Sequence, residues 1–311
     1  MKNIIQKGFL PVTEGHKIYY EEWGNPSAQP IFYLHGGPGA GFHTSNKKLF
    51  DPKNHHVIFH DQRGSGRSVP NASTTNNTTQ DLIDDINRLA DHLGVSKFML
   101  VGGSWGSTLS LLYAIAHPLR VSKMVLWSIY LARKVETDYV NSGYPRYWFP
   151  EAWERFISIV PKKDRISGDT IMNYYAKKIH SENTEEAKKF ADEWTLWELT
   201  LLSLTYTLET SREIVLQQDN LALARIETHY FMNNSFIPEN YILMNIHKIN
   251  QIPLYIIQGR FDMCTPPFGA QALYEAYGLQ ADLRWTRAGH LRSDLENRKA
   301  IKETLRSVKV S

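Results

Sequence analysis

Residues 98–116 read FMLVGGSWGSTLSLLYAIA and combine the signals of a strand, a tight turn and a helix. The apolar run 98–101 predicts a buried strand, and residues 108–116 continue as an apolar helix. Between them, GGSWG at 102–106 fits the pattern G-x-S-x-G. A tight turn from strand to helix needs small flanking residues, so the glycines let Ser104 project from the edge of the sheet. In this context the pattern favours a serine nucleophile over an ordinary glycine turn.

Short strands and helices alternate along the rest of the chain. Apolar runs bounded by Gly, Pro or Asn predict strands at 18–20, 31–34, 57–59, 123–127, 254–257 and 283–285. Helices are expected at 82–93, after Ser104, at 268–277 and after Ser293. Thr78 and Asp81 form a plausible capping box for the first of these helices. The alternation predicts an α/β fold with a mostly parallel central sheet flanked by helices.

One long segment interrupts this alternation. Residues 130–245 are rich in aromatic residues, favour helices and contain few strand signals. Strands and helices alternate again after this segment, so the two flanking parts complete one sheet. We therefore expect an α/β core made of residues 1–129 and 246–311, with a helical cap at 130–245 inserted into it.

Composition and charge exclude several classes of protein. The 311 residues include 35 basic and 32 acidic side chains, and no basic cluster is interleaved with aromatics, so no nucleic-acid partner is expected. No run approaches the roughly 20 apolar residues that span a membrane, and no signal peptide is visible. Cys264 is the one cysteine, which excludes an internal disulfide and a cysteine-ligated zinc site. We expect a cytoplasmic protein that does not bind membranes; the sequence predicts no oligomeric state.

An acid and a base follow two of the later strands. Asp262 comes just after the strand at 254–257, and His290 just after the strand at 283–285. The carboxyl ends of parallel strands meet at one edge of a sheet, so both residues are expected near Ser104. A serine hydroxyl needs a neighbouring base to take its proton, and the chain order serine, acid, histidine fits such a site. We expect Ser104 to be the nucleophile, His290 its base and Asp262 the group that orients the base, rather than an acid that caps the next helix.

A glycine-rich loop, HGGPG at 35–39, follows the strand at 31–34. We expect the N–H groups of Gly37 and Trp105 to form an oxyanion hole. A phosphate-binding loop is the alternative, but neither the Gly-Lys-Ser/Thr sequence nor the dinucleotide spacing is present. His35 is expected to support this loop, and the charges of DQRGSGRS at 61–68 to brace it through paired hydrogen bonds.

Taken together, these motifs resemble the proline iminopeptidase (prolyl aminopeptidase) family. The resemblance rests on HGGPG at 35–39, DQRGSGRS at 61–68, GGSWGSTL at 102–109, GRFDMCTP at 259–266, WTLWE at 194–198 and ARIETHYF at 224–231. It extends over nearly the whole chain, from residue 8 to residue 290. It implies an α/β-hydrolase fold and a serine peptidase that removes an N-terminal proline from peptides without metal or cofactor.

The resemblance also implies how a substrate is held. Glu198 and Glu227 would bind the charged amino terminus of the peptide, and Tyr130, Phe231 and Cys264 would line an apolar pocket for the pyrrolidine ring. An aminopeptidase must select a free ammonium group, and two carboxylates beside an apolar pocket are one way to do so. Without the resemblance, the two glutamates would be interpreted as ordinary charges on helix surfaces.

The chain departs from the family pattern at three places. It has Ser128-Ile129-Tyr130 where the family usually has Gly-Ile-Phe, Asn141-Ser142 where Tyr-Gln is common, and Tyr144-Pro145-Arg146 where Gly-Ala-Ser is common. These positions start the predicted cap and its pocket wall, so they would set the shape of the pocket and with it the strictness of proline preference.

Other functions would use the same framework. A general carboxylesterase or amidase with this triad is the alternative, although a neutral ester gives Glu198 and Glu227 nothing to bind. A dehalogenase or epoxide hydrolase would need aspartate as the nucleophile, where this chain has Ser104. An inactive scaffold protein should have lost part of the triad or the oxyanion loop, and this chain retains every part.

Overall fold

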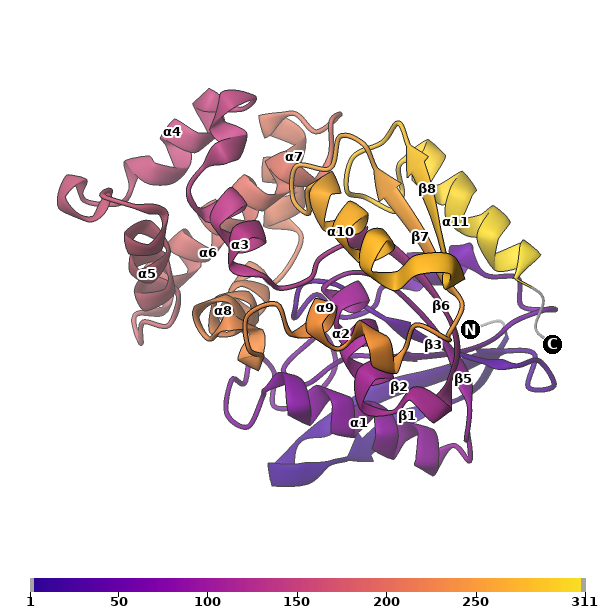
Figure 1. Cartoon of the computed structure of the whole chain (residues 1–311). Helices are drawn as coiled ribbons and strands as arrows, with labels where there is room; N and C mark the ends of the chain where they lie inside the picture. Colours follow the sequence, from indigo (N-terminus) through magenta and orange to yellow (C-terminus); the bar gives the residue numbers. More distant parts are fainter. Residues whose placement is uncertain (1–2, 309–311) are drawn as a thin grey trace.

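An eight-stranded sheet forms the centre of the computed structural model, which describes residues 3–308 (Figure 1). The strands are β1 (Ile4–Pro11), β2 (Lys17–Gly24), β3 (Pro30–Leu34), β4 (His56–His60), β5 (Phe98–Ser104), β6 (Val121–Ile129), β7 (Leu254–Gly259) and β8 (Ala281–Thr286). Their order across the sheet is β1-β2-β4-β3-β5-β6-β7-β8. β2 pairs antiparallel with β1 and β4, and the strands from β4 to β8 are parallel. The predicted α/β fold with a mostly parallel sheet is confirmed.

β1 is the strand that the sequence analysis did not predict. It lies at the edge of the sheet, and five of its eight residues are exposed, so it lacks the apolar run that marks the buried strands. Its pairing with β2 runs from Ile4 opposite Trp23 to Pro11 opposite Lys17. The backbone ladder to β2, rather than burial of an apolar face, therefore holds this strand in place.

Helices cover both faces of the sheet, because alternate residues of each strand point to opposite sides. Phe32 and Leu34 of β3 pack with α1 (Thr79–His92), α2 (Trp105–Ala116) and α10 (Pro267–Tyr277). Ile31 and Tyr33 face the other side, where α11 (Leu295–Ser307) packs. The predicted capping box starts α1: the Thr78 N–H donates to Asp81 Oδ2 at 3.0 Å, and the Asp81 N–H donates to Thr78 Oγ1 at 3.3 Å.

Six of the seven α-helices between β6 and β7 form a separate layer, which we call the cap; the seventh, α9 (Tyr241–Met244), packs with the core. The six cap helices are α3 (Lys134–Asn141), α4 (Pro150–Ser158), α5 (Gly168–Ile179), α6 (Thr184–Leu202), α7 (Leu208–Leu216) and α8 (Asn220–Met232). The cap lies to one side of the sheet in Figure 1. Its interior is aromatic: the Phe156 ring stacks on Tyr175 with ring centres 4.2 Å apart and on Trp197 at 5.6 Å. None of the helices in the described part of the chain has the length and apolarity needed to cross a membrane.

Candidate active site

The turn between β5 and α2 presents Ser104. The backbone of Ser104 has φ 58° and ψ −129°, a conformation that side chains rarely adopt. The flanking glycines are needed because a Cβ would clash at each: 2.1 Å from the indole of Trp127 at Gly103, and 2.2 Å from the Leu34 carbonyl at Gly106. The local sequence therefore fixes a strained turn that exposes the serine at the carboxyl edge of the sheet.

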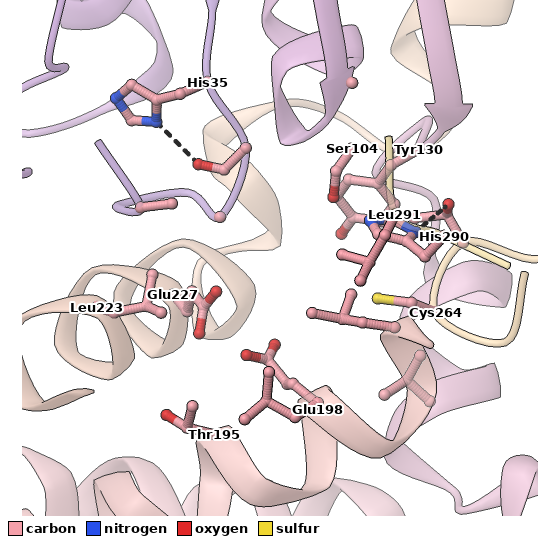
Figure 2. A pocket seen from close by; sticks show the side chains of 18 of the residues that line it. His35, Ser104, Tyr130, Thr195, Glu198, Leu223, Glu227, Cys264, His290 and Leu291 are labelled. Atoms are coloured by element: carbon pink, nitrogen blue, oxygen red, sulfur yellow. Dashed lines mark hydrogen bonds between the residues drawn. The ribbon is translucent and has the colours of Figure 1, made fainter. Parts of the chain in front are cut away.

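His290 and Asp262 form a buried pair next to this turn. Asp262 follows β7 and is 1% exposed, and His290 follows β8 and is 7% exposed. The Nδ1 atom of His290 lies 2.9 Å from Oδ2 and 3.0 Å from Oδ1 of Asp262. A carboxylate only accepts hydrogen bonds, so Nδ1 carries the proton and Nε2 is left free to accept one. Figure 2 shows Ser104 beside His290 at one end of a cavity.

Three polar residues to which the sequence analysis gave no part in the site hold this pair. The Thr265 hydroxyl donates to Asp262 Oδ2 at 2.9 Å, and the Gln258 side-chain amide donates to the same oxygen at 3.2 Å. The Ser128 hydroxyl donates to the backbone carbonyl of His290 at 2.7 Å. Gln258 could have been found from the sequence, because it is a polar residue that continues the apolar strand at 254–257. Ser128 could also have been found, because it departs from the family pattern.

The glycine-rich loop passes directly over Ser104, since a Cβ on Gly36 would lie 3.4 Å from Ser104 Cβ. His35 supports the loop: its Nδ1–H donates to the Gly36 carbonyl at 2.9 Å, and its Nε2 accepts the Gln62 N–H at 3.0 Å. Burial lowers the pKa of His35, so the ring is neutral in this network. The Gln62 side chain also accepts the indole N–H of Trp105 at 3.0 Å, which ties the loop to the first residue of α2.

The segment 61–68 braces the loops around the site through paired charges. Asp61 accepts the backbone N–H of Phe42 at 2.7 Å and the Nε–H of Arg67 at 2.7 Å. Arg63 donates to both oxygens of Asp85 at 2.6 and 2.9 Å. These carboxylates and guanidinium groups pair with one another, which gives them a structural rather than a chemical part.

A cavity of about 500 Å³ lies between the cap and the carboxyl edge of the sheet. The structure brings most of the predicted site residues together in its wall: Ser104, His290, Gly37, Glu198, Glu227, Tyr130, Phe231 and Cys264. Two predicted residues lie behind the wall, Asp262 beneath His290 and the buried ring of Trp105 beneath the loop at 35–39. Among the family departures, Tyr130 and Asn141 border the cavity, whereas Tyr144 is exposed on the cap.

The carboxyl groups of the two predicted glutamates point toward each other in the wall of the cavity (Figure 2). Glu198 comes from α6 and Glu227 from α8, and their carboxyl groups are close enough to share a hydrogen bond. The indole N–H of Trp194 donates to Glu227 Oε2 at 2.9 Å. Removal from water raises the pKa of Glu198 to about 7. Burial, and then the charge of Glu198, raise the pKa of Glu227 well above its usual range. The pair therefore resists full ionisation unless a cation joins it.

Apolar side chains form the wall beside the glutamates. The Tyr130 and Phe231 rings meet edge to face with centres 6.3 Å apart, and the Trp194 ring stacks on Phe231 at 6.4 Å. Burial raises the pKa of the Cys264 thiol well above its usual range, so Cys264 is neutral here and acts as a small apolar residue. The cavity thus combines an apolar wall with two acidic side chains.

Replacing Glu227 with glutamine is expected to stabilise the protein above neutral pH. The unfolded carboxyl has an ordinary pKa near 4.5, and the folded value is higher, so folding holds a proton that unfolding releases as the pH rises. Glutamine avoids this penalty and can still accept the Trp194 N–H. We expect the free energy of unfolding to increase at pH 8, and this gain to shrink toward pH 4.5. Urea unfolding of both proteins at the two pH values measures it; equal stability at pH 8 would contradict the raised pKa.

Comparisons with known proteins identify the family of this chain. The family model for the alpha/beta hydrolase fold matches residues 29–291. A proline iminopeptidase from Arabidopsis thaliana is 40% identical over 271 residues, 87% of this chain and 71% of the plant protein. A proline iminopeptidase from Neisseria meningitidis serogroup B is 40% identical over 294 residues, 93% of this chain and 92% of the bacterial protein.

Among solved structures, a proline iminopeptidase-related protein from Thermus thermophilus superposes with a TM-score of 0.61. It is 19% identical, and the match covers 98% of this chain and 96% of that protein, so it supports the fold alone. The assignment to a family rests on the two sequence relatives, because they are 40% identical to this chain over 87% and 93% of its length. The chain therefore belongs to the proline iminopeptidase family of α/β hydrolases.

Proposed function

We propose that this protein is a serine aminopeptidase that releases an N-terminal proline from peptides through an acyl-enzyme. The observation that carries the proposal is the pair of facing carboxyl groups, Glu198 and Glu227, in the same cavity as Ser104 and His290. The nitrogen of an N-terminal proline is a secondary ammonium with two N–H groups, one for each carboxylate. Its pyrrolidine ring is apolar and matches the wall formed by Tyr130, Phe231 and Cys264.

The triad would act in the usual two steps of acyl transfer. Ser104 attacks the prolyl carbonyl carbon while Nε2 of His290 takes the hydroxyl proton, and Asp262 stabilises the imidazolium that forms. His290 then gives this proton to the nitrogen of the departing peptide, which leaves a prolyl ester on Ser104. A water molecule, deprotonated by His290, hydrolyses the ester and frees proline.

The negative oxygen of each tetrahedral intermediate needs donors that are in place beforehand. Gly37 lies in the loop over Ser104, and Trp105 is the first residue of α2, so the Trp105 N–H has no acceptor within its own helix. These two N–H groups would form the oxyanion hole. The proposed chemistry uses side chains and backbone alone and calls for no cofactor.

The organisation and location predicted from the sequence complete the proposal. Residues 130–245 would act as a cap domain inserted between core segments 1–129 and 246–311, with the cap supplying the amine site and the core the triad. The partner is a peptide with a free N-terminal proline. The cytoplasmic location stays a prediction from the sequence.

Replacing Glu198 with glutamine should separate an aminopeptidase from the alternative, a general carboxylesterase or amidase. A hydrogen bond to a charged group contributes about 1.5–3 kcal/mol, so kcat/KM for a prolyl arylamide should fall roughly ten- to hundredfold. Hydrolysis of a small neutral ester should change far less, because the triad and the oxyanion hole are untouched. Both substrates are measured with the same enzyme preparation. An equal fall for the ester and the arylamide would favour the general hydrolase.

A further inference from the structure

The cavity wall carries a cation as well as the two glutamates. The cap supplies Glu198 and Glu227, whereas Arg292 comes from the core, two positions after His290. The cavity is therefore lined by two acidic side chains from one layer of the molecule and by a cation from the other. A free prolyl peptide also has two charges, an ammonium at its amino end and a carboxylate at its carboxyl end.

Arg292 is half-buried and has neutral partners. Its guanidinium donates to the Ser45 hydroxyl at 2.9 Å and interacts with the hydroxyl of Tyr33. The backbone N–H of Ser45 donates to Nδ1 of His43 at 3.2 Å, so Nδ1 is an acceptor, and the Ser45 hydroxyl, 2.9 Å away, points its hydrogen there. The Ser45 lone pairs are thereby directed at Arg292 and hold it at the wall.

No carboxylate within residues 3–308 forms an ion pair with Arg292, whereas Arg63 and Arg67 pair with Asp85 and Asp61. The contacts with Ser45 and Tyr33 use two of the five N–H donors of the guanidinium group, and a guanidinium can bind a carboxylate through two parallel N–H bonds. Arg292 is therefore available to an anion that enters the cavity.

Arg292 lines the same cavity as His290, the residue that would contact the departing part of the substrate. In the proposed function, on which this inference rests, His290 protonates the nitrogen of the departing peptide. The carboxyl carbon of a single departing residue lies about 2.5 Å from that nitrogen, and each added residue moves it up to about 3.5 Å farther away. We propose that Arg292 binds the C-terminal carboxylate of short prolyl peptides, so that the enzyme favours free dipeptides over amidated ones.

The test compares the dipeptide Pro-Ala with Pro-Ala amide, which differ in the terminal charge. For the unmodified enzyme, kcat/KM should be about tenfold higher for Pro-Ala, as expected for one charge-assisted contact at a half-buried site. Arg292→Gln should lose this preference by lowering only the value for Pro-Ala. Arg287→Gln is the matched control: it removes the same charge from the same loop, at a side chain that is 85% exposed and paired with Glu296. It should keep the preference.

Equal kcat/KM values of the unmodified enzyme for the two dipeptides would overturn the proposal. An equal loss for both substrates in Arg292→Gln would overturn it too, since that pattern belongs to a residue that merely supports the His290 loop. If Arg287→Gln also lost the preference for the free dipeptide, the overall positive charge of the protein, rather than Arg292, would be its cause. A prolyl arylamide distinguishes failure of the proposed function from failure of the role of Arg292. If the enzyme does not hydrolyse this compound, the proposed function is refuted. If it does, but shows no preference for the carboxylate, only the role of Arg292 is refuted.

Discussion

Replacing Ser104 with alanine is expected to lower kcat for a prolyl arylamide by roughly 10⁴- to 10⁶-fold, because members of a triad act as a unit. The fold should survive. Serine and alanine both place a Cβ at the unusual φ of 58°, and the lost hydroxyl borders the cavity rather than the packed core. His290→Ala should lose a comparable amount.

Turnover and thermal unfolding are measured on the same preparations, so that loss of activity is not confused with loss of structure. A folded Ser104→Ala protein with a rate near that of the unmodified enzyme would exclude Ser104 as the nucleophile.

Replacing Asp262 with asparagine is expected to lower kcat by roughly 10³- to 10⁴-fold with little change in shape. The Asp262 carboxylate accepts hydrogen bonds from His290, Thr265 and Gln258 and from the backbone N–H of Cys264. An asparagine has one oxygen for these donors, and its NH₂ group would have to face one of them. If it faces His290, Nδ1 becomes the acceptor and the proton moves to Nε2, where it blocks transfer from Ser104.

Asp282→Asn provides the control, because it removes the same charge from an exposed position on β8. Its kcat should match that of the unmodified enzyme. A loss below tenfold in Asp262→Asn would mean that another group orients the imidazole, and the Thr265 hydroxyl, 3.2 Å from Nδ1, would be the candidate.

The core of the fold could be predicted because its strands carry local sequence signals. Buried parallel strands such as β5 and β7 are continuous apolar runs, and the glycines around Ser104 mark the turn that follows. β1 escaped prediction because an edge strand is held by backbone pairing, which has no such apolar signature. The helices of the cap were predicted as a group, whereas their arrangement depends on aromatic contacts between distant segments, such as that of Phe156 with Trp197.

The candidate site, too, could be predicted only in part from the sequence. Ser104, Asp262 and His290 could be proposed from the sequence because each follows a recognisable strand. The facing of Glu198 and Glu227 could not be worked out from the residues alone, since it requires α6 to pack against α8; the family resemblance supplied it. The support that Ser128 gives to His290 depends on a contact between segments that are far apart in the chain.

Whether Glu198 and Glu227 bind a free amino terminus is tested by comparing a prolyl arylamide with its N-acetyl derivative. Acetylation removes the positive charge of the proline nitrogen and leaves two buried carboxyl groups without a cation, so the loss should exceed that of one charge-assisted bond. We expect kcat/KM to fall by more than about a hundredfold. If the enzyme instead hydrolysed the acetylated and the free compound at the same rate, Glu198 and Glu227 would not bind an amino terminus, and the protein would be a general hydrolase rather than an aminopeptidase.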